Sequence, residues 1–84
     1  MNITLKLYAT LTDYLPPEAR RKNAVGLDIE PAAMLGEVIE KFNLPPRLTH
    51  LVLINGHYVP PAERNSRRLA DGDVVAVWPP IAGG

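Results

Sequence analysis

Val74-Val75-Ala76-Val77-Trp78 is apolar at every position, and Pro79-Pro80 follows it directly. A strand with one face in water usually alternates apolar and polar residues, whereas a strand covered on both faces reads as a continuous apolar run. We therefore expect 74–78 to form a strand in the middle of a sheet. Proline has no backbone N–H and fixes φ, so this strand should end at Pro79 and leave the sheet as a short extended stalk.

Two stretches near the N-terminus alternate with the period of two that half-buried strands show. In the first, Ile3, Leu5 and Leu7 are separated by more polar residues. The second, 25–29, repeats the same alternation. Both are expected to be strands that turn one face to the core, and the connection 10–23 between them shows no such period.

The period then changes to that of a helix. Apolar residues fall at i, i+3, i+4 and i+7, namely at Leu35, Val38, Ile39 and Phe42. Leu44-Pro45 ends the pattern, because proline disfavours helical angles in the residue before it. The helix begins without a Ser or Thr cap, and Gly36 inside it predicts close packing of the helix against a sheet.

A hairpin and a final turn complete the chain. Residues 51–54 are a continuous apolar strand, and Asn55-Gly56 after them is the strongest two-residue hairpin signal. The turn Asp71-Gly72-Asp73 leads into 74–78. The order is therefore strand, strand, helix, strand, short strand, strand. It predicts an α+β fold with a mixed four- to five-stranded sheet, parallel first and last strands, and one main helix across one face.

Length and composition exclude several classes of function. Eighty-four residues make one small domain, and nine basic residues balance nine acidic ones, which argues against nucleic acid as a partner. The chain has no cysteine, and His50 and His57 are too far apart to hold a metal together. No stretch is apolar for long enough to cross a membrane, and no signal peptide is visible, so we expect a cytoplasmic protein with no metal site.

Several motifs, in this order, carry a family resemblance. Leu35-Gly36-Glu37, Ile54-Asn55-Gly56, Leu69-Ala70-Asp71-Gly72-Asp73 and the ending Pro79-Pro80-Ile81-Ala82-Gly83-Gly84 resemble the ubiquitin-related sulfur carriers of the MoaD/ThiS type. The element order is that of their ubiquitin-like β-grasp fold. Pro79-Pro80 before the diglycine is most similar to the small subunit of molybdopterin synthase.

The resemblance implies a β-grasp domain at 1–78 and a flexible tail at 79–84. An adenylyltransferase resembling the ubiquitin-activating enzymes would use ATP to activate the Gly84 carboxylate, and a sulfur donor would convert it to a thiocarboxylate. The large subunit of molybdopterin synthase, or another sulfur-accepting enzyme, would then take the sulfur. The protein itself would bind no cofactor and would be a co-substrate and synthase subunit rather than an enzyme. The residues that thread the tail into its partners would be Pro79, Pro80, Ile81, Ala82 and Gly83.

Side chains near the tail are candidates for gripping a partner. If Val75 and Val77 face the helix, then Val74, Ala76 and Trp78 face away from it, and Tyr8 on the neighbouring strand shares their face. Trp and Tyr are enriched among binding hot spots. The basic cluster, which is expected to steer an acidic partner, consists of Arg64, Arg67 and Arg68.

Alternatives remain open at this point. The sulfur acceptor could belong to thiamine, cysteine or tRNA thiolation rather than to molybdenum or tungsten cofactor synthesis. A protein modifier would use the same tail, with a lysine amine attacking the activated Gly84 to form an isopeptide. A β-grasp binding module with an inert tail is a third class. In each case we expect the free protein to be a monomer.

Overall fold

A computed structural model describes residues 1–80 of the 84-residue chain. Its strands are β1 (Asn2–Leu7), β2 (Ala24–Asp28), β3 (Leu51–Ile54), β4 (His57–Tyr58) and β5 (Val74–Trp78). The α-helix is α1 (Leu35–Lys41), and the 3₁₀ helices are η1 (Ala9–Tyr14), η2 (Pro17–Lys22), η3 (Pro46–Leu48) and η4 (Pro61–Glu63). The expected reacting residue Gly84 and the threading residues 81–83 lie outside the described residues.

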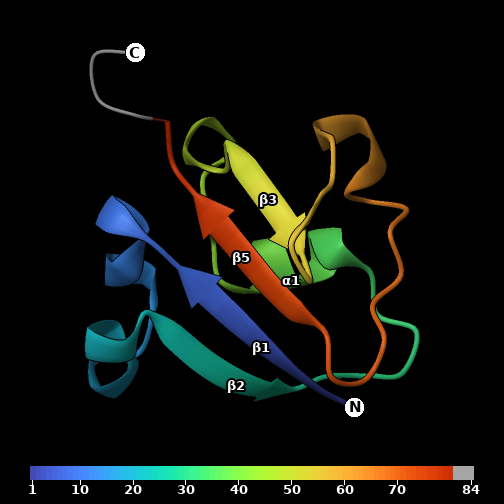
Figure 1. The fold of residues 1–84 in the computed structure, drawn as a ribbon, viewed down its shortest axis with the longest axis horizontal. Helices are drawn as coiled ribbons and strands as arrows, with labels where there is room; N and C mark the ends of the chain where they lie inside the picture. The colour runs from blue at the N-terminus through green and yellow to red at the C-terminus, as the bar shows by residue number, and fades with distance from the viewer. Residues whose placement is uncertain (81–84) are drawn as a thin grey trace.

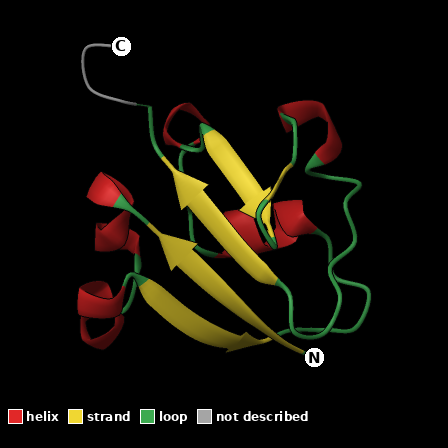
Figure 2. Ribbon diagram, in the orientation of Figure 1, coloured by secondary structure: helices red, strands yellow, loops and turns green. Residues whose placement is uncertain are grey.

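The strands form one five-stranded mixed sheet in the order β2-β1-β5-β3-β4 (Figure 1, Figure 2). β1 and β5 run parallel, with Leu5 opposite Val75, and the remaining neighbours are antiparallel. The last strand is therefore central, as its uninterrupted apolar sequence predicted. The ubiquitin-like β-grasp fold class is confirmed.

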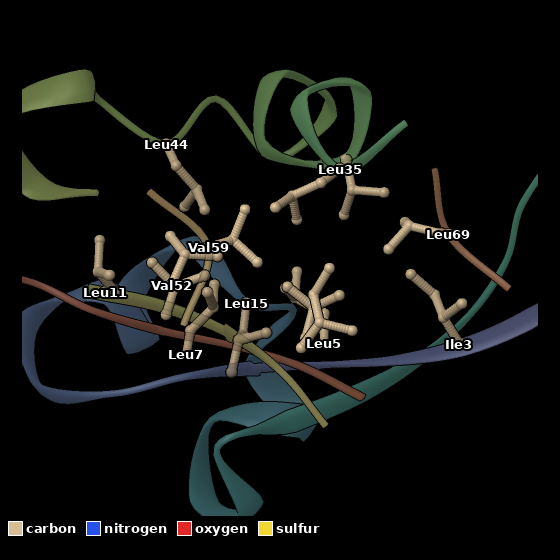
Figure 3. Close-up of a cluster of buried hydrophobic side chains, with 14 of the residues drawn as sticks. Ile3, Leu5, Leu7, Leu11, Leu15, Leu35, Leu44, Val52, Val59 and Leu69 are labelled. Carbon is tan, nitrogen blue, oxygen red and sulfur yellow. The ribbon is translucent and has the colours of Figure 1, made fainter. Parts of the chain in front are cut away.

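The core lies between this sheet and α1. Every second residue of β1, β3 and β5 points inward. Those with no exposed surface are Leu5, Leu7, Val52, Val75 and Val77. From α1, Leu35 and Val38 are buried against them. Figure 3 shows Leu35 and Leu44 reaching from the helical side towards Leu5 and Leu7. In Figure 1, α1 lies behind β5, so the face turned to the viewer is the outer face of the sheet.

The start of α1 is completed by backbone groups from a distant loop. Met34 precedes the helix in an extended conformation and makes no side-chain cap. The N–H groups of Leu35 and Gly36 instead donate to the carbonyl oxygens of Arg67 (2.8 Å) and Arg64 (2.9 Å). Unpaired N–H groups at a helix start need such acceptors. The missing Ser or Thr cap is thus replaced by the 60–69 loop.

Gly36 is explained by this loop and not by the sheet, which corrects the expectation from the sequence. A Cβ on residue 36 would overlap Oδ1 of Asn65 and would lie 3.3 Å from the Asn65 Cα. The glycine therefore allows the loop to approach the first turn of α1 closely.

The connection 10–23 is more ordered than its sequence suggested. It folds into η1 and η2, which bury Leu11, Leu15 and Ala19. The Arg20 guanidinium donates to the carbonyl oxygens of Leu15 (3.1 Å) and Asp13 (3.2 Å) and ties the two short helices together. Helices of one or two 3₁₀ turns leave no long periodic pattern, so the sequence did not indicate them.

Candidate tail base and partner-binding face

The last residues of β5 are held on both sides. The Val77 carbonyl accepts from the Tyr8 N–H (3.2 Å), and the Trp78 carbonyl accepts from the His50 N–H (3.2 Å). Pairing then stops because Pro79 and Pro80 have no N–H to donate. Pro79 is half-buried and Pro80 is exposed. The sheet therefore fixes the point and the direction at which the chain leaves it, which we call the tail base.

An aromatic pair marks the outer face at the tail base. The rings of Tyr8 and Trp78 are stacked, with centroids 4.3 Å apart and planes 3° from parallel. Both residues are half-buried. The structure thus brings these two candidate residues together, on the face that the alternation of β5 predicted.

A larger apolar surface continues from this pair across β5, β3 and β4. Ala76 stands opposite Leu53, and Leu53 stands opposite Tyr58, so the three share one row of the outer face. Leu51 stands opposite Trp78 in the next row. Two of these residues are exposed, Leu51 at 37% and Tyr58 at 55%. The outer patch, as we name it, comprises Tyr8, Leu51, Leu53, Tyr58, Trp78 and the buried Ala76, which is only 8% exposed.

Sequence reasoning missed three members of the outer patch. Leu51 and Leu53 belong to an uninterrupted apolar run, which suggested burial on both faces, and Tyr58 belongs to a strand of two residues. The alternation of side chains along a strand could have identified the two leucines. Once Val52 and Ile54 face the core, Leu51 and Leu53 must face outward.

Val74 shares this face but lies away from the tail base. It stands opposite Thr4 at the other end of β5, and its N–H donates to Oδ1 of Asn55 (2.9 Å). Asn55 and Gly56 form the predicted hairpin turn, with φ of +51° and +84°. Val74 therefore lies at the margin of the face and outside the outer patch.

Arg64 occupies a different place from the exposed cluster that we expected. Only 8% of its surface is exposed. Its guanidinium donates to the carbonyl oxygens of Val59 (3.2 Å), Thr49 (2.7 Å) and His50 (3.0 Å). Desolvation by burial lowers the pKa of Arg64, and interaction with Tyr58 partly offsets this. Arg64 is therefore a buried structural contact of the loop and does not present its charge to a partner.

Arg67 and Arg68 are exposed and lie in the same loop, beside the start of α1. The Arg67 carbonyl accepts from the Leu35 N–H at the start of α1, and Arg68 forms an isolated β-bridge with Met34. The structure does not bring the three arginines together with the aromatic pair. Steering of an acidic partner stays a prediction for the exposed Arg67 and Arg68, whereas the buried Arg64 cannot contribute its charge to it.

Within residues 1–80, no group of three or more His, Asp or Glu side chains could hold a metal ion. Within the same residues, no helix has the length and apolar character needed to cross a bilayer.

Comparison with solved structures places the fold. The solution structure of the Haloferax volcanii HVO 2177 protein is similar over 100% of this chain and 87% of that one, with a TM-score of 0.75 and 28% identity. Small archaeal modifier protein 1 from Haloferax volcanii covers 95% of this chain and 98% of its own (TM-score 0.64, 21% identity). The thiamine biosynthesis protein ThiS from Geobacter metallireducens covers 100% of both chains (TM-score 0.66, 17% identity).

A further match was solved together with a partner. Subunit 1 of molybdopterin-converting factor from Helicobacter pylori, determined in complex with subunit 2, is similar over 100% of both chains, with a TM-score of 0.61 and 15% identity. Identities at this level show a shared fold only. Among curated proteins, no sequence matches the chain.

The sequence itself matches the model of one family. The Mut7-C ubiquitin model aligns with residues 1–82, which is nearly the whole chain. The chain therefore belongs to the Mut7-C ubiquitin family, and it has the β-grasp fold of the MoaD/ThiS-like, ubiquitin-related proteins that its motifs resemble.

Proposed function

We propose that this protein is a sulfur carrier that works through its C-terminal carboxylate. The observation that carries the proposal is the tail base. The central strand is hydrogen-bonded on both sides up to Trp78, and the sequence then continues as Pro79-Pro80 and ends on Gly83-Gly84. Residues without side chains suit a narrow channel in a partner enzyme. In this proposal the protein is a co-substrate and not a catalyst, because its own Gly84 carboxylate is the group that partner enzymes modify.

The chemistry would proceed in two steps on Gly84. Its carboxylate oxygen attacks the α-phosphate of ATP on an adenylating enzyme, forming an acyl adenylate and releasing pyrophosphate. Hydrosulfide then attacks the acyl carbon and AMP leaves with one carboxylate oxygen, so that sulfur replaces that oxygen with no change of oxidation state. The resulting thiocarboxylate is a nucleophile that a second enzyme can use.

For the acceptor we propose molybdopterin synthesis, with the protein as the small subunit of the synthase. Pro79-Pro80 before the diglycine supports this choice, and so does the similarity to a molybdopterin-converting factor subunit solved with its partner. Delivery to thiamine, cysteine or tRNA thiolation would use the same thiocarboxylate with another acceptor enzyme.

Protein modification is the second candidate, supported by the similarity to small archaeal modifier protein 1. In that case a lysine amine attacks the acyl adenylate, AMP leaves, and an isopeptide bond forms. The two functions are separable in cell extracts. A carrier accumulates as thiocarboxylate without conjugates of higher mass, whereas a modifier gives a ladder of conjugates.

Intact-mass spectrometry tests the carrier function directly. The protein is incubated with candidate adenylating enzymes, ATP and sulfide, and we expect a mass gain equal to the difference between sulfur and oxygen, located at Gly84. The matched control lacks Gly83 and Gly84. It should fold normally, since the described core residues extend only to Val77, and it should gain no mass. If several authentic activating enzymes leave the full chain unchanged, the carrier function is wrong.

A further inference from the structure

Lys6 is the single charged side chain within the central rows of the outer face. The outward positions of the five strands near the patch are Thr4, Lys6, Ala24, Gly26, Leu51, Leu53, Tyr58, Val74, Ala76 and Trp78. Asp28 is the next charged outward position. It lies four residues along β2 from Ala24, the residue opposite Lys6, which is about 13 Å away at the rise of a strand.

The residues on either side of Lys6 in its row of the sheet are both small. Ala24 lies opposite it on β2, and Ala76 lies opposite it on β5. Both side chains are a single methyl group, so they can cover only the base of the lysine stem. A lysine in such a position lays its methylenes along apolar surface and keeps its ammonium in water.

No carboxylate in the described residues neutralises this ammonium. The one ion pair among residues 1–80 joins the N-terminal ammonium of Met1 to Asp28, at 3.3 Å. Asp28 is therefore distant and already engaged. The Lys6 side chain is half-buried, so part of it is open to solvent.

A partner that covers the outer patch must cover Lys6 as well, because Lys6 adjoins Ala76 in the same row. Taking an unpaired ammonium out of water is strongly unfavourable, whereas an opposite charge with good geometry offsets the loss. We propose that Lys6 selects the partner, and that the enzyme receiving the tail presents a carboxylate to Lys6 within an otherwise apolar surface. This inference rests on the proposed function, because it assigns the outer patch to the enzyme that activates Gly84.

A second copy of this chain is a poor occupant of the same surface. A two-fold interface brings identical patches face to face. The outer patch contains no Asp or Glu, so a second copy could not pair Lys6 from within its own patch. The opposing charge must therefore come from a different protein.

The test compares the KM for the carrier among Lys6 variants, in the ATP-dependent activation of Gly84. Lys6→Met keeps the stem but leaves the partner's carboxylate unpaired, and should raise the KM about tenfold. Lys6→Glu adds repulsion between two negative charges and should raise the KM further. Lys6→Arg keeps the positive charge, and its KM should stay close to that of the wild type. The matched control is Lys41→Glu on α1, which makes the same change of net charge on the opposite layer and should change the KM less than threefold.

A zero-length carbodiimide crosslink identifies the partner group. The reagent activates a carboxylate, and a lysine amine in contact with it displaces the activating group to form an amide. We expect peptide mapping to find Lys6 joined to an Asp or Glu of the activating enzyme. Changing that residue to Lys should restore binding of Lys6→Glu.

The outcomes separate this inference from the function beneath it. If the wild-type protein is activated but Lys6→Glu and Lys41→Glu have the same KM, the role of Lys6 is overturned and the carrier function stands. Crosslinks through Lys22 or Lys41 but not through Lys6 would likewise overturn the role of Lys6 and leave the carrier function standing. If no enzyme activates the wild-type chain, both proposals fall. Concentration-dependent dimerisation that is abolished by Lys6→Glu would replace the partner enzyme with a second copy.

Discussion

The guanidinium of Arg64 joins three backbone carbonyls from two separate segments of the chain. Two of them, on Thr49 and His50, precede β3, and the third, on Val59, follows β4. The His50 N–H in turn donates to the last carbonyl of β5, on Trp78. Arg64 therefore supports the segment that holds the tail base, without contacting the tail base itself.

Replacing Arg64 by Met tests this support. The change keeps an apolar stem but leaves buried carbonyls without a donor, and each such group costs on the order of 1–3 kcal/mol. We expect the free energy of unfolding to fall by about 3 kcal/mol in urea titrations. Amide hydrogen exchange at His50 should also accelerate. Arg67→Met, at an exposed position, is the control and should change stability by no more than about 0.5 kcal/mol. Equal effects of the two substitutions would contradict the assignment.

The burial of Arg64 could not be predicted from the sequence. Arg64, Arg67 and Arg68 occur in one polar stretch and look alike there. Which of them is buried depends on where the carbonyls of residues 49, 50 and 59 lie after folding. The pairing of Tyr8 with Trp78 could be predicted, because strand parity places both on the outer face once β1 and β5 are neighbours.

At the scale of elements, hydrophobic periods, apolar runs and the Asn55-Gly56 turn predicted the five strands and α1, but not how α1 begins. A hydrophobic period reports which face of an element is buried. It carries no information about acceptors supplied by a remote loop, and here the carbonyls of Arg64 and Arg67 receive the first N–H groups of α1. Pro31 illustrates the limit: it suits a first helical turn, yet the helix begins only at Leu35.

A double substitution at Gly36 and Asn65 tests the packing of the loop on α1. Alanine has the better helix propensity by about 1 kcal/mol, but at position 36 its Cβ would overlap the Asn65 side chain. We expect Gly36→Ala to destabilise the protein by roughly 1 kcal/mol. In an Asn65→Ala background the same change should be neutral or stabilising, which thermal unfolding of the four proteins measures.

Gly26→Ala supplies the control for this cycle. A Cβ at position 26 would meet nothing within 4 Å, so Gly26→Ala should not lower the thermal stability. Additive effects of Gly36→Ala and Asn65→Ala, without a coupling energy near 1 kcal/mol, would show that the loop does not constrain the helix.

At the scale of the whole molecule, the sheet joins the beginning of the chain to the end. β1 pairs in parallel with β5, and Tyr8 at the end of β1 both stacks on Trp78 and donates to Val77. The outer patch adjoins the tail base at Tyr8, Leu51 and Trp78. We therefore expect a partner that binds the patch to be positioned next to the point where the chain leaves the sheet.

Trp78 provides the final test, since it is the only tryptophan of the chain. Trp78→Ala removes the largest side chain of the outer patch and leaves the inward core residues Val75 and Val77 in place. We expect the variant to keep its circular dichroism spectrum and cooperative unfolding while its KM as a carrier rises at least tenfold, as hot-spot truncations do. Trp78→Phe retains a ring that can stack on Tyr8, so its KM should rise much less.

Fluorescence of the wild type tests the same contact. Docking of the activating enzyme should shift Trp78 emission to shorter wavelength, because a half-exposed indole loses water. Global unfolding of Trp78→Ala would mean that Trp78 is needed for the core and would contradict its docking role. An emission spectrum that does not change when the enzyme docks would mean that the partner does not bind this face.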